Sequence, residues 1–185
     1  MLSATYWLDH EDMMAKVFVY IPVPESIGKQ LVTSIEANID TTEMTNQGAL
    51  TATSGHVTLL FVGTDLDDKQ VETVLKKCKA LGKRTTQFEV HLRGTGLFTI
   101  SGSDGHILYA AVESWEPMSL HKDLTKAIPF AEHAMQYVPH VTLVHLGPFV
   151  VAHVNVSYKW VVTDMIVSID DRKVPISLSG SRIRL

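Results

Sequence analysis

The sequence predicts an α+β protein made of two similar halves that face each other across one cleft. The main observation is an eight-residue phrase that occurs twice, as HVTLLFVG at 56–63 and as HVTLVHLG at 140–147. The order strand, helix, loop and HVT strand is predicted for 16–63 and again for 107–147. Of the 185 residues, 45% are hydrophobic and 19% are charged, a composition typical of a folded domain with a sizeable core.

One domain is predicted at 16–178, preceded by an extension at 1–15 and followed by a tail at 179–185. No run of about 18 apolar residues occurs, so no membrane span is expected. The first residues lack a basic region followed by an apolar one, so we expect no signal peptide and a cytoplasmic protein.

The first half begins with an apolar strand at 16–23, which two prolines bring to an end. A helix opens at Pro24 and carries apolar residues at i+4 spacing. The polar stretch 38–55 has no period, so a long loop is expected there. A second helix is predicted at 64–81, with acidic residues at its start, lysines near its end and Gly82 after it.

A short strand is predicted at 88–92, which Gly94 and Gly96 are expected to interrupt. The second half then repeats the order of strand, helix and loop. The remaining predicted elements are a turn at 101–105, a strand at 107–112, a helix at 118–128, a loop at 130–138, and strands at 159–169 and 174–178.

Each HVT phrase is short, apolar and β-branched and ends at Gly, as expected of a buried strand. Successive strand residues point to opposite faces. His56 and Thr58 therefore share one face, as do His140 and Thr142, while the valines and leucines between them turn toward a core. Two such strands that meet would present two imidazoles and two hydroxyls to one small substrate.

The other reactive residue types form no comparable pattern. Cys78 is the only cysteine, and its helical spacing with Val71 and Val74 indicates a core position. His145 follows His140 by five, so it is predicted to face away from that residue and to pack as Phe61 does in the first copy. Surface or structural positions are expected for His91, His106, His121, His133 and His153.

Charge and cysteine content also exclude some classes of function. The net charge of −4 argues against a protein that grips long nucleic acid through its phosphates. A zinc site is disfavoured by the single cysteine and by the absence of a His-Glu-x-x-His motif. No metal or other cofactor is therefore expected.

Several motifs together resemble the two-histidine (2H) phosphoesterases, in the branch of 2′-5′ RNA ligase-like and phage proteins. The matching stretches are the two His-x-Thr strands, GLFT at 96–99, SDG at 103–105, ILYA at 107–110, YVPHVT at 137–142 and the strand around Trp160. The resemblance covers roughly 16–178. It implies a two-lobed fold with antiparallel-rich sheets, flanking helices and a central cleft.

The resemblance and the residues lead to the same chemistry. One histidine would take a proton from water or a ribose hydroxyl, and the other would protonate the leaving oxygen. Thr58 and Thr142 would donate hydrogen bonds to the phosphate oxygens. Tyr137 and Phe98 are the candidates for stacking on a base. Which histidine is the base stays open.

The expected function is cleavage of a small nucleotide phosphodiester by a monomeric enzyme that needs no metal. A 2′,3′-cyclic phosphate, a 2′-5′ linkage or a cyclic oligonucleotide would each suit such a site. Similarity to phage members implies a counter-defence enzyme that degrades a cyclic nucleotide signal. The alternatives are a nucleotide-binding module without turnover, and the processing or ligation of RNA ends.

Overall fold

The computed structural model describes residues 14–99, 105–132, 136–148, 150 and 152–181. Its helices are α1 (Glu25–Glu36), α2 (Asp68–Arg84), α3 (Glu116–Ala127) and the short 3₁₀ helix η1 (Thr41–Glu43). Its strands are β1 (Ala15–Pro22), β2 (Met44–Ala49), β3 (His56–Leu66), β4 (Phe88–Thr99), β5 (His106–Val112), β6 (His140–Leu146), β7 (Ser157–Val162), β8 (Asp164–Ile169) and β9 (Arg172–Ser177).

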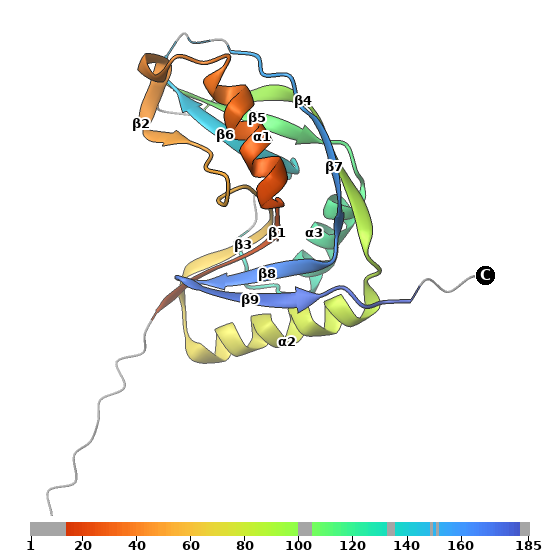
Figure 1. Cartoon of the computed structure of the whole chain (residues 1–185). Coiled ribbons are helices and arrows are strands. Elements are labelled where there is room, and N and C mark those ends of the chain that lie inside the picture. Colours follow the sequence, from red (N-terminus) through yellow and green to blue (C-terminus); the bar gives the residue numbers. More distant parts are fainter. Residues whose placement is uncertain (1–13, 100–104, 133–135, 149, 151, 182–185) are drawn as a thin grey trace, which may run out of the picture.

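The strands form one curled sheet whose pairs are all antiparallel. Its order is β7-β4-β5-β6-β3-β1-β8-β9, and β2 pairs with β6 beside this path. In Figure 1, α1, β2, β5 and β6 lie above β1, β8, β9 and α2, and the strands β4 and β7 run between the two groups. The predicted α+β class with an antiparallel-rich sheet is therefore confirmed.

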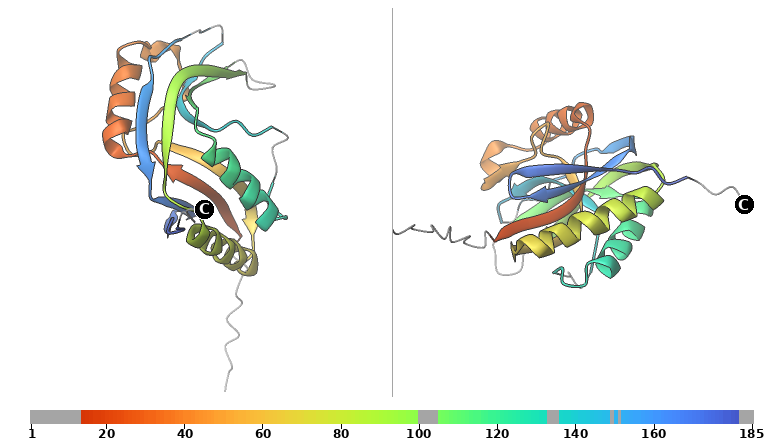
Figure 2. Two further views of the ribbon diagram at one scale, coloured as in Figure 1. Left: turned by 90° about the vertical axis from the view of Figure 1, so that its right-hand side faces the viewer. Right: turned by 90° about the horizontal axis from the view of Figure 1, so that it is seen from below.

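Each of the three α-helices packs an apolar face against the part of the sheet nearest to it. α1 contacts β6, α2 contacts β8 and β9, and α3 contacts β3; Figure 2 shows α2 and α3 side by side on one side of the sheet. Leu31 and Ile35 of α1 and Val74 of α2 are almost completely buried in one common core. The valine and leucine side chains of both HVT strands pack into this core.

The order β1, α1, β3 in the first half is repeated by β5, α3, β6 in the second. Both HVT strands also show the same burial pattern over their first seven residues. The division into an extension at 1–15, a domain at 16–178 and a tail at 179–185 stays a prediction, because 1–13 and 182–185 lie outside the described residues.

Four expected elements differ from the structure. The predicted loop 38–55 contains η1 and β2, because β2 pairs through its backbone with β6 and needs no apolar pattern. The second helix begins at Asp68, after a capping box between Asp67 and Gln70, because β3 runs on to Leu66.

That helix also continues through Gly82, which is buried where a Cβ would overlap β9. The strand at 88–92 runs on to Thr99, because Gly94 takes a φ of 72° and the ladder resumes beyond this irregularity. The strand predicted at 159–169 is two strands. It breaks at Thr163, where the chain leaves β4 for β1. The turn predicted at 101–105 lies mostly outside the described residues.

Gly28 in α1 makes a close contact that leads to a testable change in stability. A Cβ on Gly28 would overlap the backbone oxygen of Ala52 and lie 2.9 Å from its carbonyl carbon. Since backbone cannot swing aside, we expect Gly28→Ala to lower the free energy of unfolding by about 1–3 kcal/mol. Denaturant unfolding measures this. Gln30→Ala, at an exposed position of the same helix, should change it by less than about 0.5 kcal/mol. Equal stability of the two variants would contradict the close packing.

Candidate active site

The two HVT strands lie next to each other in the middle of the sheet. β3 and β6 are aligned antiparallel with Val57 opposite Val141, and both valines are fully buried. Antiparallel register about this pair places the histidine of each motif across from the threonine of the other. The four polar side chains are half-buried on the face opposite the core. The structure therefore brings His56, Thr58, His140 and Thr142 together.

The two imidazoles are held in the same way by backbone two residues earlier. Nδ1 of His56 lies 2.8 Å from the carbonyl oxygen of Ser54, and Nδ1 of His140 lies 2.7 Å from that of Val138. A carbonyl can only accept, so Nδ1 carries the proton and donates it. Nε2 is then the nitrogen that each ring offers to a substrate.

The pKa of His140 is held below its ordinary value of 6.5. Burial of the ring is the main cause and disfavours the charged form. The hydrogen bond to Val138 acts in the opposite direction, and the nearby charge of His56 lowers the pKa further. At neutral pH, His140 is therefore an uncharged imidazole with a free lone pair on Nε2.

A tyrosine accompanies each HVT strand, which the sequence analysis missed. Tyr20 on β1 pairs with Thr58, and Tyr109 on β5 pairs with Thr142. The ring of Tyr20 lies 5.1 Å from that of His56, and the ring of Tyr109 lies 5.5 Å from that of His140, centroid to centroid. Aligning 17–22 with 106–111 puts both tyrosines at one position of the repeat, a signal that could have identified them.

Phe98, predicted to stack on a base, lies at the site near the end of β4. Its ring stacks on Tyr109 at 4.1 Å and meets His140 edge-on at 4.9 Å. Gly96 makes room for this arrangement, because a Cβ there would overlap the Tyr109 hydroxyl. One face of Phe98 is thus covered by protein.

Tyr137, the other predicted aromatic, is tied to the backbone of β3. Its hydroxyl donates to the Thr58 carbonyl oxygen at 2.8 Å, and its ring stacks on His121 at 3.9 Å. Nδ1 of His121 in turn lies 2.7 Å from the Leu59 carbonyl oxygen. Burial raises the pKa of the Tyr137 hydroxyl. His121 therefore supports β3 from α3, and Tyr137 supports it from the segment before β6, a proximity that no sequence spacing indicates.

Within the described part of the chain, a cavity adjoins the quartet at each of its ends. The first, of about 220 Å³, is lined mainly by apolar and aromatic side chains, and we call it the aromatic pocket. The residues that define it are Thr58, Leu59, Leu60, Phe61, Phe98, His121, Glu132, Gln136, Tyr137, Val138 and His140. The second, of about 170 Å³, is called the imidazole pocket and is defined by Gly48, Ala49, Leu50, Ser54, His56, Thr142, Leu143 and His145.

The prediction that His145 faces away from His140 is wrong. A register shift in the β5–β6 ladder pairs Tyr109 with Thr142 but Ile107 with His145. Tyr109 and Ile107 share a face of β5, so their partners share a face of β6. A β-bulge at Leu143 and Val144, both buried, has reversed the alternation. His145 therefore lines the imidazole pocket beside Thr142.

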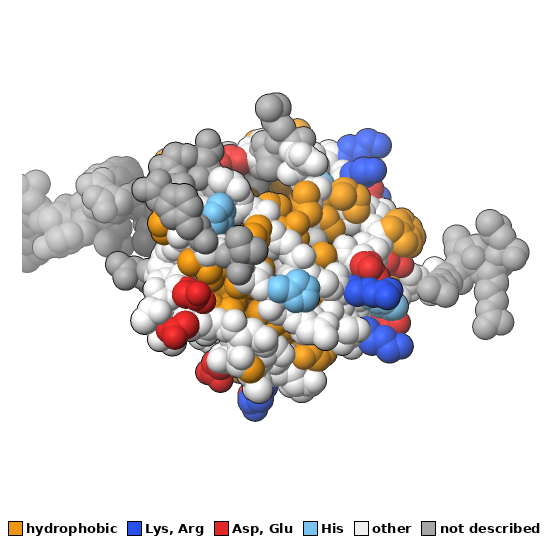
Figure 3. Space-filling model, turned by 90° about the horizontal axis from the view of Figure 1, so that it is seen from above, with side chains coloured by type: hydrophobic (Ala, Val, Ile, Leu, Met, Phe, Trp, Pro, Cys, Tyr) orange, Lys and Arg blue, Asp and Glu red, His pale blue; other side chains and the backbone are white. Residues whose placement is uncertain are grey.

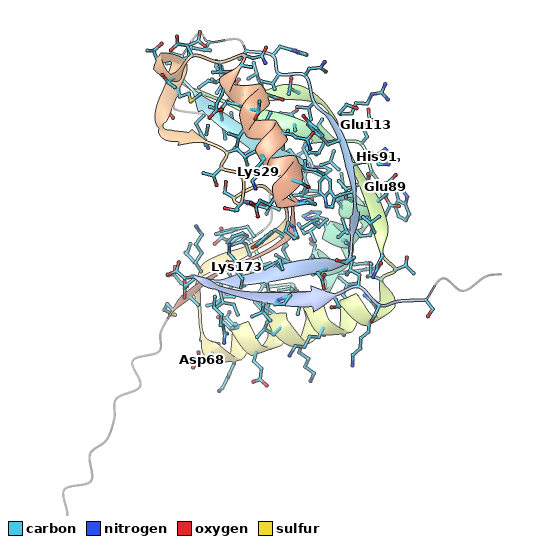
Figure 4. The ribbon with its side chains drawn as sticks, in the orientation of Figure 1. Lys29, Asp68, Glu89, His91, Glu113 and Lys173 are labelled. Atoms are coloured by element: carbon cyan, nitrogen blue, oxygen red, sulfur yellow. The ribbon has the colours of Figure 1, made fainter. Side chains whose placement is uncertain are left out.

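Two other reactive residues, Cys78 and His91, lie outside this site. Cys78 is buried in the core, as predicted, and burial raises the pKa of its thiol to about 12. His91 is exposed and lies 2.6 Å from Glu89 on β4, where Figure 4 shows both beside Glu113 at the edge of the molecule. His133 lies outside the described residues.

The described residues contain no group of three or more His, Cys, Asp or Glu side chains able to hold a metal ion. None of the helices in this part of the chain is long and apolar enough to cross a membrane. Seen from above in Figure 3, hydrophobic and histidine side chains occupy the middle of the surface, and acidic and basic side chains lie toward its edge.

Solved structures of similar fold cover nearly the whole chain. LigT of E. coli in its apo form has a TM-score of 0.73 at 15% identity, over 89% of this chain and 95% of its own. TT0787 of Thermus thermophilus has a TM-score of 0.72 at 19% identity, over 90% and 100%. Usb1 of Kluyveromyces marxianus, solved with uridine monophosphate, has a TM-score of 0.55 at 11% identity, over 88% and 98%. At these identities the likeness shows the fold.

No curated protein matches the sequence. The family model described as the 2′-5′ RNA ligase superfamily matches residues 23–153, which is more than half of the chain and includes both HVT strands. Together with the fold, this match shows that the chain belongs to the 2′-5′ RNA ligase superfamily of 2H phosphoesterases.

Proposed function

We propose that the chain is a metal-independent phosphodiesterase that cleaves a small nucleotide by acid–base catalysis between His140 and His56. The observation that carries this proposal is the matched pair of imidazoles, each with Nδ1 held by backbone and Nε2 left for substrate. The hydroxyls of Thr58 and Thr142 make no side-chain hydrogen bond within the described part of the chain, so they are available to phosphate oxygens.

The lowered pKa of His140 supports its role as the base. A water molecule or a ribose 2′-hydroxyl attacks phosphorus and gives its proton to Nε2 of His140. The bond from phosphorus to the leaving oxygen breaks, and His56, which enters the reaction as the imidazolium with a proton on each ring nitrogen, gives its Nε2 proton to that oxygen. The two threonine hydroxyls donate to the non-bridging oxygens, where negative charge gathers in the transition state.

The size and character of the two cavities support a small nucleotide as substrate. The aromatic pocket can take one base against Phe98 and Tyr137, with a phosphate over the quartet. Solved structures of E. coli LigT include complexes with 3′-AMP, ATP and NADP+, so a protein of this fold binds small nucleotides. A 2′,3′-cyclic phosphate, a 2′-5′ linkage and a cyclic oligonucleotide are the substrate classes proposed here. We also propose that the protein acts as a monomer in the cytoplasm, where it would degrade cyclic nucleotide signals in a counter-defence role.

A substrate panel with EDTA present tests the reaction. Nucleoside 2′,3′-cyclic phosphates, 2′-5′-linked and 3′-5′-linked dinucleotides and cyclic dinucleotides and trinucleotides are incubated with the protein, and products are separated by chromatography. We expect turnover of at least one class at a rate that EDTA leaves unchanged, because the two imidazoles and two hydroxyls supply the proton transfers and charge stabilisation. Tight binding without product would instead make the protein a nucleotide-binding module, and loss of turnover in EDTA would refute the metal-independent mechanism.

A further inference from the structure

The two HVT strands match at most of the positions that face the site and differ at one of them. Both HVT strands keep the histidine, the threonine, the paired tyrosine and two consecutive buried residues after the motif. The next position is Phe61 in the first strand and His145 in the second. Phe61 lines the aromatic pocket, and His145 lines the imidazole pocket. The repeat therefore places a hydrocarbon ring at one end of the site and a hydrogen-bonding ring at the other.

The two pockets also differ in the charge of the residues that line them. The aromatic pocket includes a carboxylate, Glu132, which disfavours an anion. None of the described residues that define the imidazole pocket is acidic, and they include two imidazoles and the free hydroxyl of Thr142. An anionic part of a ligand is therefore favoured at the second end and disfavoured at the first.

The ring of His145 is set up as a hydrogen-bond donor. Its Nδ1 is buried and has no hydrogen-bond partner among the described residues. A proton on this atom would leave a buried donor unsatisfied, so the neutral ring carries its proton on Nε2. In His56 and His140, by contrast, Nδ1 carries a proton and donates it to backbone. His145 can thus give a hydrogen bond in the pocket but cannot serve as a second base in this form.

We propose that His145 and the imidazole pocket form a subsite for a second phosphate of the substrate, on the leaving-group side of the scissile phosphorus. The inference rests on the proposed function, because it places the scissile phosphate over the quartet and the first base in the aromatic pocket. The leaving oxygen then lies toward His56, and the chain of the substrate continues past Thr142 to His145. Substrates that carry a phosphate beyond the leaving ribose are preferred over those that end at a hydroxyl.

Three adenylyl dinucleotides with a 2′-5′ linkage, one of the substrate classes proposed above, test the subsite. One is ApA, the second, ApAp, has an extra phosphate on the leaving ribose, and the third, pApA, has it at the opposite end. We expect kcat/KM for ApAp to exceed that for ApA about tenfold, as expected for one hydrogen bond to a charged group, whereas pApA gains nothing.

His145→Phe copies the residue of the first HVT strand and should abolish the preference for ApAp while leaving ApA within about twofold of the wild-type value. His145→Gln retains a donor and should keep part of the preference. His153→Phe, at an exposed histidine outside the site, is the control and should behave as the wild type. A preference for ApAp that survives in His145→Phe, or an equal loss for ApA and ApAp, would overturn the subsite.

A binding measurement separates this proposal from the proposed hydrolysis. If the wild-type protein cleaves none of the three dinucleotides, their dissociation constants are measured by calorimetry on the wild-type and His145→Phe proteins. Tighter binding of ApAp that His145→Phe removes would support the subsite and contradict only the hydrolysis. Equal binding of all three dinucleotides to both proteins would overturn the subsite.

Discussion

Replacement of His140 or His56 by alanine is expected to lower kcat/KM by about 10²–10⁴-fold each, the usual contribution of one general acid or base. In the proposed reaction, His140→Ala removes the group that takes the proton of the nucleophile, and His56→Ala removes the donor to the leaving oxygen. Because the two roles belong to one concerted transfer, the double variant should lose less than the product of the two single losses. Steady-state kinetics on the best substrate of the panel measures each loss.

Stability and pH dependence provide the controls for this prediction. Circular dichroism should show folded protein in all variants, and His91→Ala, at an exposed position outside the site, should retain wild-type activity. For the wild type, kcat/KM should follow a bell-shaped pH profile. In the proposed reaction His140 must be neutral to act, so the midpoint of the acidic limb should lie below pH 6.5. A rate that does not change from about pH 5 to pH 9, or near-normal activity in either alanine variant, would contradict the assigned roles.

Thr58→Val and Thr142→Val are expected to lower kcat by about 10²–10³-fold each, with a much smaller change in KM. Valine has nearly the shape of threonine and fits a strand well, so the fold should persist. What is lost is a hydroxyl that donates to a phosphate oxygen as its charge grows in the transition state.

The matched controls for these variants are Thr58→Ser and Thr142→Ser, which keep the hydroxyl and remove only a methyl group. The serine variants should retain most of the wild-type kcat. If valine and serine at the same position gave equal rates, the hydroxyl would have no role in the reaction, and the effect would belong to packing against Tyr20 or Tyr109.

Much of the fold follows from local patterns in the sequence. The alternation in HVTL puts His56 and Thr58 on one face and Val57 in the core, and the structure shows this arrangement. The duplicated order of elements correctly predicts that the two HVT strands meet. Their meeting depends only on apolar strands that must be buried and on a repeat that supplies two of them.

The errors arise where backbone pairing, and not side-chain pattern, decides the structure. The strand β2 pairs with β6 although its sequence, MTNQGA, shows no alternation. The orientation of His145 depends on a bulge, and the two adjacent apolar residues Leu143 and Val144 are the only local sign of it. The break at Thr163 between β7 and β8 falls within a continuous strand-like sequence, because consecutive strands that pair with distant partners need no change in composition.

The short β3–β6 ladder at Val57 and Val141 has a consequence for the separation of the two imidazoles. At these two valines, β3 pairs with β6 over a very short ladder, whereas β1–β3 and β5–β6 are paired over most of their lengths. A small rotation about this short ladder would change the separation of His56 and His140 and leave the β1–β3 and β5–β6 pairs intact. A ligand whose phosphate bridges both imidazoles would fix this separation, so in the proposed reaction the substrate itself would hold the two histidines in place.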